Sequence, residues 1–211
     1  LTGAFQAMNA LCAAGLAIAC GADVERTISA LGCLAGVRGR IERVAVHPAG
    51  AAVYVDYAHK PDALKTVLET LRPYTRARLA VVFGCGGERD PGKRSEMGAI
   101  ACRLADRVIV TDDNPRGEDP AAIRREILQG CSAAMGERLS EIGDRGKAIA
   151  AAIEELSEGD VLVIAGKGHE QGQIVGKTVL PFDDAEAACA AVAALARKAT
   201  SSREGEDRHG D

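Results

Sequence analysis

The sequence is poor in aromatic residues, with three Phe, three Tyr and no Trp among its 211 residues, or 3%. Apolar residues nevertheless make up 47% of the chain, so a core must be built from Ala, Val, Leu and Ile. Ala-rich helices packed on Val- and Ile-rich strands meet this condition. The length is sufficient for one good-sized α/β domain with an attached segment.

An excess of positive charge is also missing. Lys and Arg number 26 against 30 Asp and Glu, the net charge is −4, and the basic residues are dispersed. These values argue against a nucleic-acid surface. The apolar stretch 11–21 is too short to span a bilayer and has no basic segment before it. We therefore expect small-molecule partners, with no nucleic acid and no membrane, and a monomer.

The seven cysteines form no C-x-x-C pair and are odd in number, which favours reduced thiols in a cytoplasmic protein. We expect most of them to be small core residues. The four histidines lack the spacing of metal ligands, and His169-Glu170 does not continue into H-E-x-x-H. No metal site is predicted within the chain.

Hydrophobic patterning predicts an α/β fold: a Rossmann-like, mainly parallel sheet with helices on both faces, preceded by two helices. The expected helices cover 4–20, 23–33, 61–71, 93–104, 120–131, 145–156 and 184–197. The expected strands cover 41–46, 52–55, 79–83, 107–111, 138–142 and 161–165, with a hairpin at 173–180. The flexible joint at 36–40 is the candidate domain boundary, and we expect a disordered tail at 198–211. Because Leu1 is not Met and already lies in a helical pattern, we expect a fragment of a longer polypeptide.

Four polar segments follow predicted strands, at 56–62, 84–89, 112–116 and 166–170. In an open parallel sheet the carboxyl ends of the strands form the ligand-binding edge, so these loops should converge on one site. Each segment alone is weak evidence, because it has an ordinary reading as a turn, a helix cap or a solvated surface.

The segment Thr111 to Arg116 carries the strongest chemical signal. Pro115 fixes a turn that presents Arg116, and an arginine fork binds carboxylates in a bidentate manner. Arg89 is a candidate second ligand for a carboxylate, and Glu170 could hold an ammonium group. These three residues predict a pocket for an acidic amino acid.

A phosphate-binding loop is not predicted. The spacing from Gly87 through Gly92-Lys93 resembles a P-loop, but Arg94 stands where Ser or Thr would bind magnesium. Pro91 also removes a backbone donor from this loop. In the first polar segment, Asp56 can accept hydrogen bonds from a ribose, and His59 can contact either a nucleotide or a neighbouring loop.

Together these motifs resemble the Mur ligase family, most closely its diaminopimelate-adding members. The resemblance runs in family order over residues 1 to about 195 and rests on Asn9 after Phe5, 39–42, 56–64, 84–90, 113–116 and 166–170. It implies that residues 1–38 end the central ATP-binding domain and that 39–197 form the C-terminal Rossmann-like, amino-acid-binding domain. Gln6 departs from the family pattern, which often has Asn there.

The resemblance also implies the function and the site. The family forms a peptide bond with ATP and Mg²⁺, here by adding meso-2,6-diaminopimelate to UDP-N-acetylmuramoyl-L-alanyl-D-glutamate. The implied amino-acid ligands are Arg89, Asp113, Asn114, Pro115, Arg116, Gly166 and Glu170. The implied ATP contacts are Asn9, Arg40, Asp56 and His59. Catalytic residues and Mg²⁺ ligands are expected before Leu1, so the fragment alone should be inactive.

Three alternatives stay open. A lysine-adding ligase of the same family would differ in substrate, although such relatives lack the Asp-Asn-Pro-Arg combination. A non-catalytic amino-acid-binding module would account for the missing P-loop. A folylpolyglutamate-synthetase-like ligase would share the architecture but not the segment 113–116.

Overall fold

The computed structural model describes residues 2–206. The strands are β1 (Glu42–Val46), β2 (Ala52–Asp56), β3 (Leu79–Phe83), β4 (Arg107–Val110), β5 (Leu139–Glu141), β6 (Val161–Ala165), β7 (Gly172–Val175) and β8 (Thr178–Pro181). The α-helices are α1 (Ala4–Ala19), α2 (Val24–Leu31), α3 (Pro61–Leu71), α4 (Gly92–Leu104), α5 (Pro120–Gln129), α6 (Arg145–Glu154) and α7 (Asp184–Glu206). Two short 3₁₀ helices cover Arg72–Tyr74 and Ala133–Arg138. The predicted alternation of strands and helices is confirmed.

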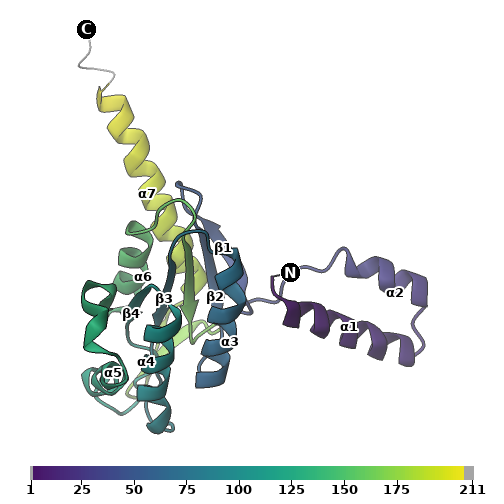
Figure 1. Cartoon of the computed structure of the whole chain (residues 1–211), viewed down its shortest axis with the longest axis horizontal. Helices are drawn as coiled ribbons and strands as arrows, with labels where there is room; N and C mark the ends of the chain where they lie inside the picture. The colour runs from purple at the N-terminus through teal and green to yellow at the C-terminus, as the bar shows by residue number, and fades with distance from the viewer. Residues whose placement is uncertain (1, 207–211) are drawn as a thin grey trace.

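Six strands form one sheet in the order β1-β2-β6-β3-β4-β5 (Figure 1). All neighbours are parallel except β1 and β2, which form an antiparallel pair at the edge. β6 is the last of these strands along the chain, yet it pairs with both β2 and β3. The predicted mainly parallel sheet is therefore confirmed, and its carboxyl edge collects the loops after β2, β6, β3 and β4.

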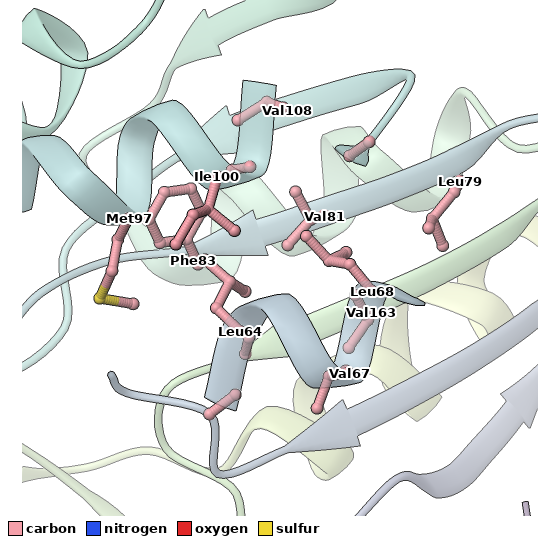
Figure 2. Close-up of a cluster of buried hydrophobic side chains, with 14 of the residues drawn as sticks. Leu64, Val67, Leu68, Leu79, Val81, Phe83, Met97, Ile100, Val108 and Val163 are labelled. Carbon is pink, nitrogen blue, oxygen red and sulfur yellow. The ribbon is translucent and has the colours of Figure 1, made fainter. Parts of the chain in front are cut away.

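Helices cover both faces of the sheet, and each face has its own core. Helices α3, α4 and α5 pack side by side on one face, and α6 and α7 on the other. Figure 2 shows the first core, in which apolar side chains of α3 and α4 meet those of the strands. Its labelled members are Leu64, Val67, Leu68, Leu79, Val81, Phe83, Met97, Ile100, Val108 and Val163. The second core includes Val53, Val55, Val82, Ile109, Ile149, Ile153, Leu162 and Ile164. Burial of aliphatic side chains thus forms most of both cores, as expected for a chain with few aromatic residues.

Helices α1 and α2 lie beside each other, away from the helices that cover the sheet (Figure 1). Asp23 caps α2, since its carboxylate accepts a hydrogen bond from the backbone N–H of Arg26 at 2.8 Å. Gln6 connects α1 to the sheet domain through a 3.2 Å hydrogen bond from Nε2 to the carbonyl oxygen of Arg40. An ion pair between Arg38 and Asp183 also connects the segment after α2 to the residues just before α7.

Helix α7 is described as far as Glu206, whereas a disordered tail was predicted over 198–211; residues 207–211 lie outside the described part of the chain, and the tail stays a prediction. The segment around Arg197 is rich in Ala, Arg and Lys, whose helix propensity favours continuation of a helix already anchored on the sheet. The prediction that most cysteines are core residues was wrong: Cys85 is buried, two are half-buried, and Cys12, Cys20, Cys33 and Cys189 are exposed. Within residues 2–206, no helix has the length and apolar character required to cross a membrane.

Candidate functional site

A cavity of about 660 Å³ lies at the carboxyl edge of the sheet. Its walls come from the loops that follow β2, β3, β4 and β6 and from the first turns of α3 and α4. The predicted convergence of the four polar segments is therefore confirmed. This is the position at which open parallel sheets bind ligands, and here β6 separates β2 from β3.

Most of the predicted amino-acid ligands line this cavity. They are Arg89, Asp113, Asn114, Arg116, Gly166 and Glu170, and they are joined by His59 from the predicted ATP set. The remaining predicted residues, Pro115, Asn9, Arg40 and Asp56, are not among its lining residues. The cavity also includes Lys60, Lys93 and Glu96, which sequence reasoning did not select.

Arg116 is held at the cavity by contacts on both sides. Its Nη1 donates hydrogen bonds to the carbonyl oxygens of Gly87 at 2.8 Å and Asn114 at 3.4 Å. Its backbone pairs with the β7–β8 hairpin, donating to the carbonyl of Ile174 at 3.0 Å and accepting from Gly176 at 2.7 Å. Arg116 also has a φ of 51°, which a non-glycine residue rarely adopts without such support. The predicted arginine fork is thus fixed in place, with guanidinium nitrogens left to face the cavity.

The glycines between β3 and α4 allow one loop to pack on another. A Cβ on Gly84 would lie 2.3 Å from the carbonyl oxygen of Thr111, and one on Gly87 would lie 2.0 Å from that of Pro115. Gly87 also donates its backbone N–H to the carbonyl of Asn114 at 2.9 Å. These glycines therefore bring the backbone of this loop against the segment 111–116.

Lys167 is a central residue that sequence reasoning missed. Its side chain is fully buried, and Nζ donates to Asn114 Oδ1 at 2.8 Å and to the carbonyl oxygen of Gly172 at 2.7 Å. It also lies 3.4 Å from Asp113 Oδ1 and 3.7 Å from Glu170 Oε2. Burial lowers the pKa of Lys167, while the carboxylates of Asp113 and Glu170 act in the opposite direction. The only sequence signal was its place between two glycines, in a loop that follows a buried strand.

Arg145 is a buried arginine at the same edge, on the face of the sheet that α6 and α7 cover. The guanidinium of Arg145 forms a bidentate pair with Asp184, with Nε–Oδ1 and Nη2–Oδ2 distances of 2.7 Å, and both side chains are fully buried. Arg145 Nη2 also donates to the carbonyl oxygen of Ala165 at 3.0 Å, at the end of β6. Asp183 caps α7 by accepting from the N–H of Ala185 at 2.9 Å. Of these two neighbouring acids, Asp183 therefore caps the helix and Asp184 neutralises Arg145.

Two of the four residues predicted to meet ATP, Arg40 and His59, lie around Tyr57. The guanidinium carbon of Arg40 lies 4.6 Å from the centre of the Tyr57 ring, and the rings of His59 and His169 lie 4.5 and 5.3 Å from it. Asp56 supports this loop: its two carboxylate oxygens accept backbone N–H bonds from Ile41 and Ala58, each at 2.8 Å. Asn9 is exposed on α1. The contacts of these residues with ATP stay predictions.

The rejected P-loop segment has a structural role instead. Arg94, at the position where a P-loop would need Ser or Thr, is buried and forms ion pairs with Glu118 and Glu126, each at 2.9 Å. Lys93 Nζ donates to the carbonyl oxygen of His59 at 2.9 Å, which joins α4 to the loop before α3.

The cavity has the charge pattern of a site for a zwitterion. Its cations are Lys60, Arg89, Lys93 and Arg116, and its carboxylates are Asp62, Asp90, Glu96, Asp113 and Glu170. Such a mixture suits a ligand that carries both ammonium and carboxylate groups. No cluster of three or more His, Cys, Asp or Glu residues in the described part of the chain could hold a metal ion.

Comparisons with known proteins agree with this geometry. Residues 39–168 match the glutamate ligase domain of Mur ligases. Two relatives are each named UDP-N-acetylmuramoyl-L-alanyl-D-glutamate--2,6-diaminopimelate ligase. The one from Caulobacter vibrioides is 61% identical over 184 residues, covering 87% of this chain and 37% of the relative. The one from Bradyrhizobium diazoefficiens is 59% identical over 193 residues, covering 92% and 39%.

A solved structure of a ligase with the same name superposes with a TM-score of 0.73 at 40% identity, over 92% of this chain and 39% of that one. A Mycobacterium tuberculosis folylpolyglutamate synthase superposes with a TM-score of 0.60 at 24% identity, which shows a shared fold alone. The chain thus spans less than two-fifths of the length of the diaminopimelate ligases it matches. Its sheet order, its loop motifs and these matches show that the chain belongs to the Mur ligase family, whose glutamate ligase domain it contains.

Proposed function

We propose that this chain is the amino-acid-binding part of an ATP-dependent ligase that adds meso-2,6-diaminopimelate to UDP-N-acetylmuramoyl-L-alanyl-D-glutamate. This reaction builds a peptidoglycan precursor from small, water-soluble molecules, which fits a monomeric cytoplasmic enzyme. The observation that carries the proposal is one cavity containing Arg89 and Arg116 together with Asp113 and Glu170. The same substrate is supported by relatives that are named as diaminopimelate ligases, one of which is 61% identical to this chain.

The two arginines explain why diaminopimelate fits better than lysine. Diaminopimelate differs from lysine by a second carboxylate on its distal carbon. Arg116 is already oriented by Gly87 and Asn114, and no hydrogen bond or ion pair engages the Arg89 side chain within residues 2–206. One or both guanidinium groups would bind the distal carboxylate, and Asp113 and Glu170 would hold the neighbouring ammonium group.

The reaction proceeds in two steps. The glutamyl carboxylate of the UDP-linked dipeptide attacks the γ-phosphate of ATP, giving an acyl phosphate and ADP. The free amine of diaminopimelate then attacks the acyl carbon, and the tetrahedral intermediate expels phosphate while the nitrogen loses a proton to solvent, which leaves the amide. The contribution of this chain is to fix the attacking amine, with Arg40, Asp56, His59 and Asn9 expected to touch or frame ATP across the cleft.

ATP ligases of this kind use Mg²⁺, but the described residues of this chain do not fit a metal site. Mg²⁺ and the residues that activate the glutamyl carboxylate would belong to the parts of the relatives that this chain does not span.

Isothermal titration calorimetry of the chain with meso-diaminopimelate and with L-lysine tests the proposal. We expect diaminopimelate to bind at least tenfold more tightly than lysine, because only it supplies a partner for the second arginine. The same two amino acids compared as substrates of the complete ligase provide the second readout. A lysine preference in both experiments would replace this proposal with the lysine-adding alternative. Amino-acid binding without any ligation would favour the non-catalytic module.

A further inference from the structure

Lys167 lies behind the cavity and connects two of its walls to the β7–β8 hairpin. It is fully buried and does not line the cavity itself. Its Nζ contacts Asn114 from the loop after β4, Glu170 from its own loop after β6, and the carbonyl oxygen of Gly172 at the start of β7. One ammonium group therefore joins the two loops that carry the proposed amino-acid ligands to the β7–β8 hairpin.

The Asn114 side chain links the Lys167 ammonium group to the Glu170 carboxylate, which lines the cavity. Its Oδ1 accepts from Lys167 Nζ at 2.8 Å and from the backbone N–H of Ile174 at 2.9 Å. These two donors fix the amide orientation, because they require the oxygen on that side. Nδ2 must then point the other way, where it donates to Glu170 Oε2 at 3.0 Å. The position of the Glu170 carboxylate therefore depends on a lysine that touches no ligand.

The charge of Lys167 has a second consequence. Asp113 and Glu170 both lie within 4 Å of Nζ, at 3.4 and 3.7 Å. Opposite charges at this separation attract each other, so one ammonium group draws both carboxylates to the same side of the cavity. Lys167 thereby holds Asp113 and Glu170 close together before any ligand arrives.

We propose that Lys167 is a positioning residue that fixes Asn114 and holds Asp113 and Glu170 in the geometry required to bind the ammonium end of the amino acid. The identity of that amino acid rests on the proposed function, but the positioning of Asn114 does not. The prediction can therefore be tested both without a ligand and with one.

The ligand-free test is amide hydrogen exchange on Lys167→Met, which keeps the side-chain length and removes the charge. Loss of the Nζ donor should release Asn114 Oδ1, so exchange at the Ile174 amide should accelerate at least tenfold. Exchange at Val82 in the central strand β3 should not change. Lys177→Met, which removes a lysine from the exposed turn between β7 and β8, is the matched control. Unchanged exchange at Ile174, or equal acceleration at Val82, would overturn the proposal.

The ligand test compares KM values in the complete ligase. Lys167→Met should raise the KM for diaminopimelate by about 10- to 100-fold, as typical losses of supporting contacts do, and leave the KM for ATP within about twofold. A general structural defect would move both constants. If the unsubstituted enzyme does not use diaminopimelate, the proposed function fails, and the exchange experiment alone then decides the role of Lys167. If the enzyme does use it and the diaminopimelate KM does not change, the role proposed for Lys167 fails.

Discussion

Nη1 of Arg116 lies 2.8 Å from the carbonyl oxygen of Gly87 and donates a hydrogen bond to it. This bond joins the loop after β4 to the loop after β3, so the residue proposed to select the substrate also holds two walls of the cavity together. Its guanidinium is therefore oriented before any carboxylate binds. A preoriented cation loses less conformational freedom on binding than a mobile one.

Replacing Arg116 should affect diaminopimelate much more than lysine. Removing one partner of a desolvated charge pair costs about 2–5 kcal/mol, so Arg116→Ala should raise the KM for diaminopimelate roughly 30- to 5,000-fold. Activity with lysine, which lacks the distal carboxylate, should change little. Steady-state kinetics with both amino acids measures the difference. An unchanged diaminopimelate KM would refute the role of Arg116.

Gly87→Ala should push the loop after β3 away from the loop after β4. The added Cβ would lie 2.0 Å from the carbonyl oxygen of Pro115, a distance that requires the backbone to move. We expect a lower melting temperature and at least tenfold weaker diaminopimelate binding, because Arg116 moves with its loop. Gly15→Ala on α1 is the control: no atom lies within 4 Å of its added Cβ, and Ala favours a helix by about 1 kcal/mol. A Gly87→Ala protein with unchanged stability and binding would contradict the observed loop packing.

Asp160→Asn should weaken the fold at neutral pH and reduce its sensitivity to acid. Burial opposes ionisation of Asp160, but hydrogen bonds from the Arg78 side chain and from the backbone of Ser157 and Arg78 outweigh it and lower the pKa below 3.8. The carboxylate therefore stabilises the fold fully above pH 3.8, and this stabilisation is lost as the pH falls through the lower folded-state pKa. Loss of charge-assisted hydrogen bonds costs about 1.5–3 kcal/mol.

Urea denaturation at pH 7 and at several values between pH 4 and 2 measures this effect. The free energy of unfolding should fall less steeply with acid in Asp160→Asn than in the unsubstituted protein. Glu69→Gln, on the exposed face of α3, should change stability by no more than about 0.5 kcal/mol. Parallel acid profiles for Asp160→Asn and the unsubstituted protein would show that Asp160 is not the group responsible.

Thiol titration should separate the cysteines into two classes. The four exposed thiols, Cys12, Cys20, Cys33 and Cys189, should react with Ellman's reagent at pH 8 in a fast phase. Burial raises the pKa of Cys85 and of Cys131 to about 12 and also raises that of Cys102, so few of these thiols form the reactive thiolate. Cys189→Ser should reduce the fast phase from four thiols to three. A fast phase of seven would show that the described burial is wrong.

The sequence predicted the order of the elements because the strands are short apolar runs such as Val161–Ala165 and the helices between them are amphipathic. The site was largely predictable for the same reason, since loops after parallel strands must meet at one edge. Arg89, Arg116 and Glu170, which line the cavity, could be selected from their chemistry, whereas Asp113 was implied by the family resemblance.

Other features depend on contacts between residues distant in the sequence. Lys167 is 53 residues from Asn114, and no local pattern distinguishes a lysine buried by folding from a solvated one. Arg145 and Asp184 are likewise 39 residues apart, so neither could be recognised as half of a buried ion pair. The cysteine prediction was wrong because it used average burial, whereas Cys12, Cys20 and Cys33 lie in or beside helices that stand away from the sheet.

The position of β6 has a consequence for how the chain is made. Val163 pairs with Tyr54 of β2 on one side and with Val81 of β3 on the other, although the ribosome makes it after every other strand of the sheet. Before that point the nascent chain can form only two separate parts, β1-β2 and β3-β4-β5, each exposing an unpaired strand edge. A chain whose synthesis stops before Val161 would leave the edges of β2 and β3 unpaired, and we expect such a product to aggregate or to be degraded.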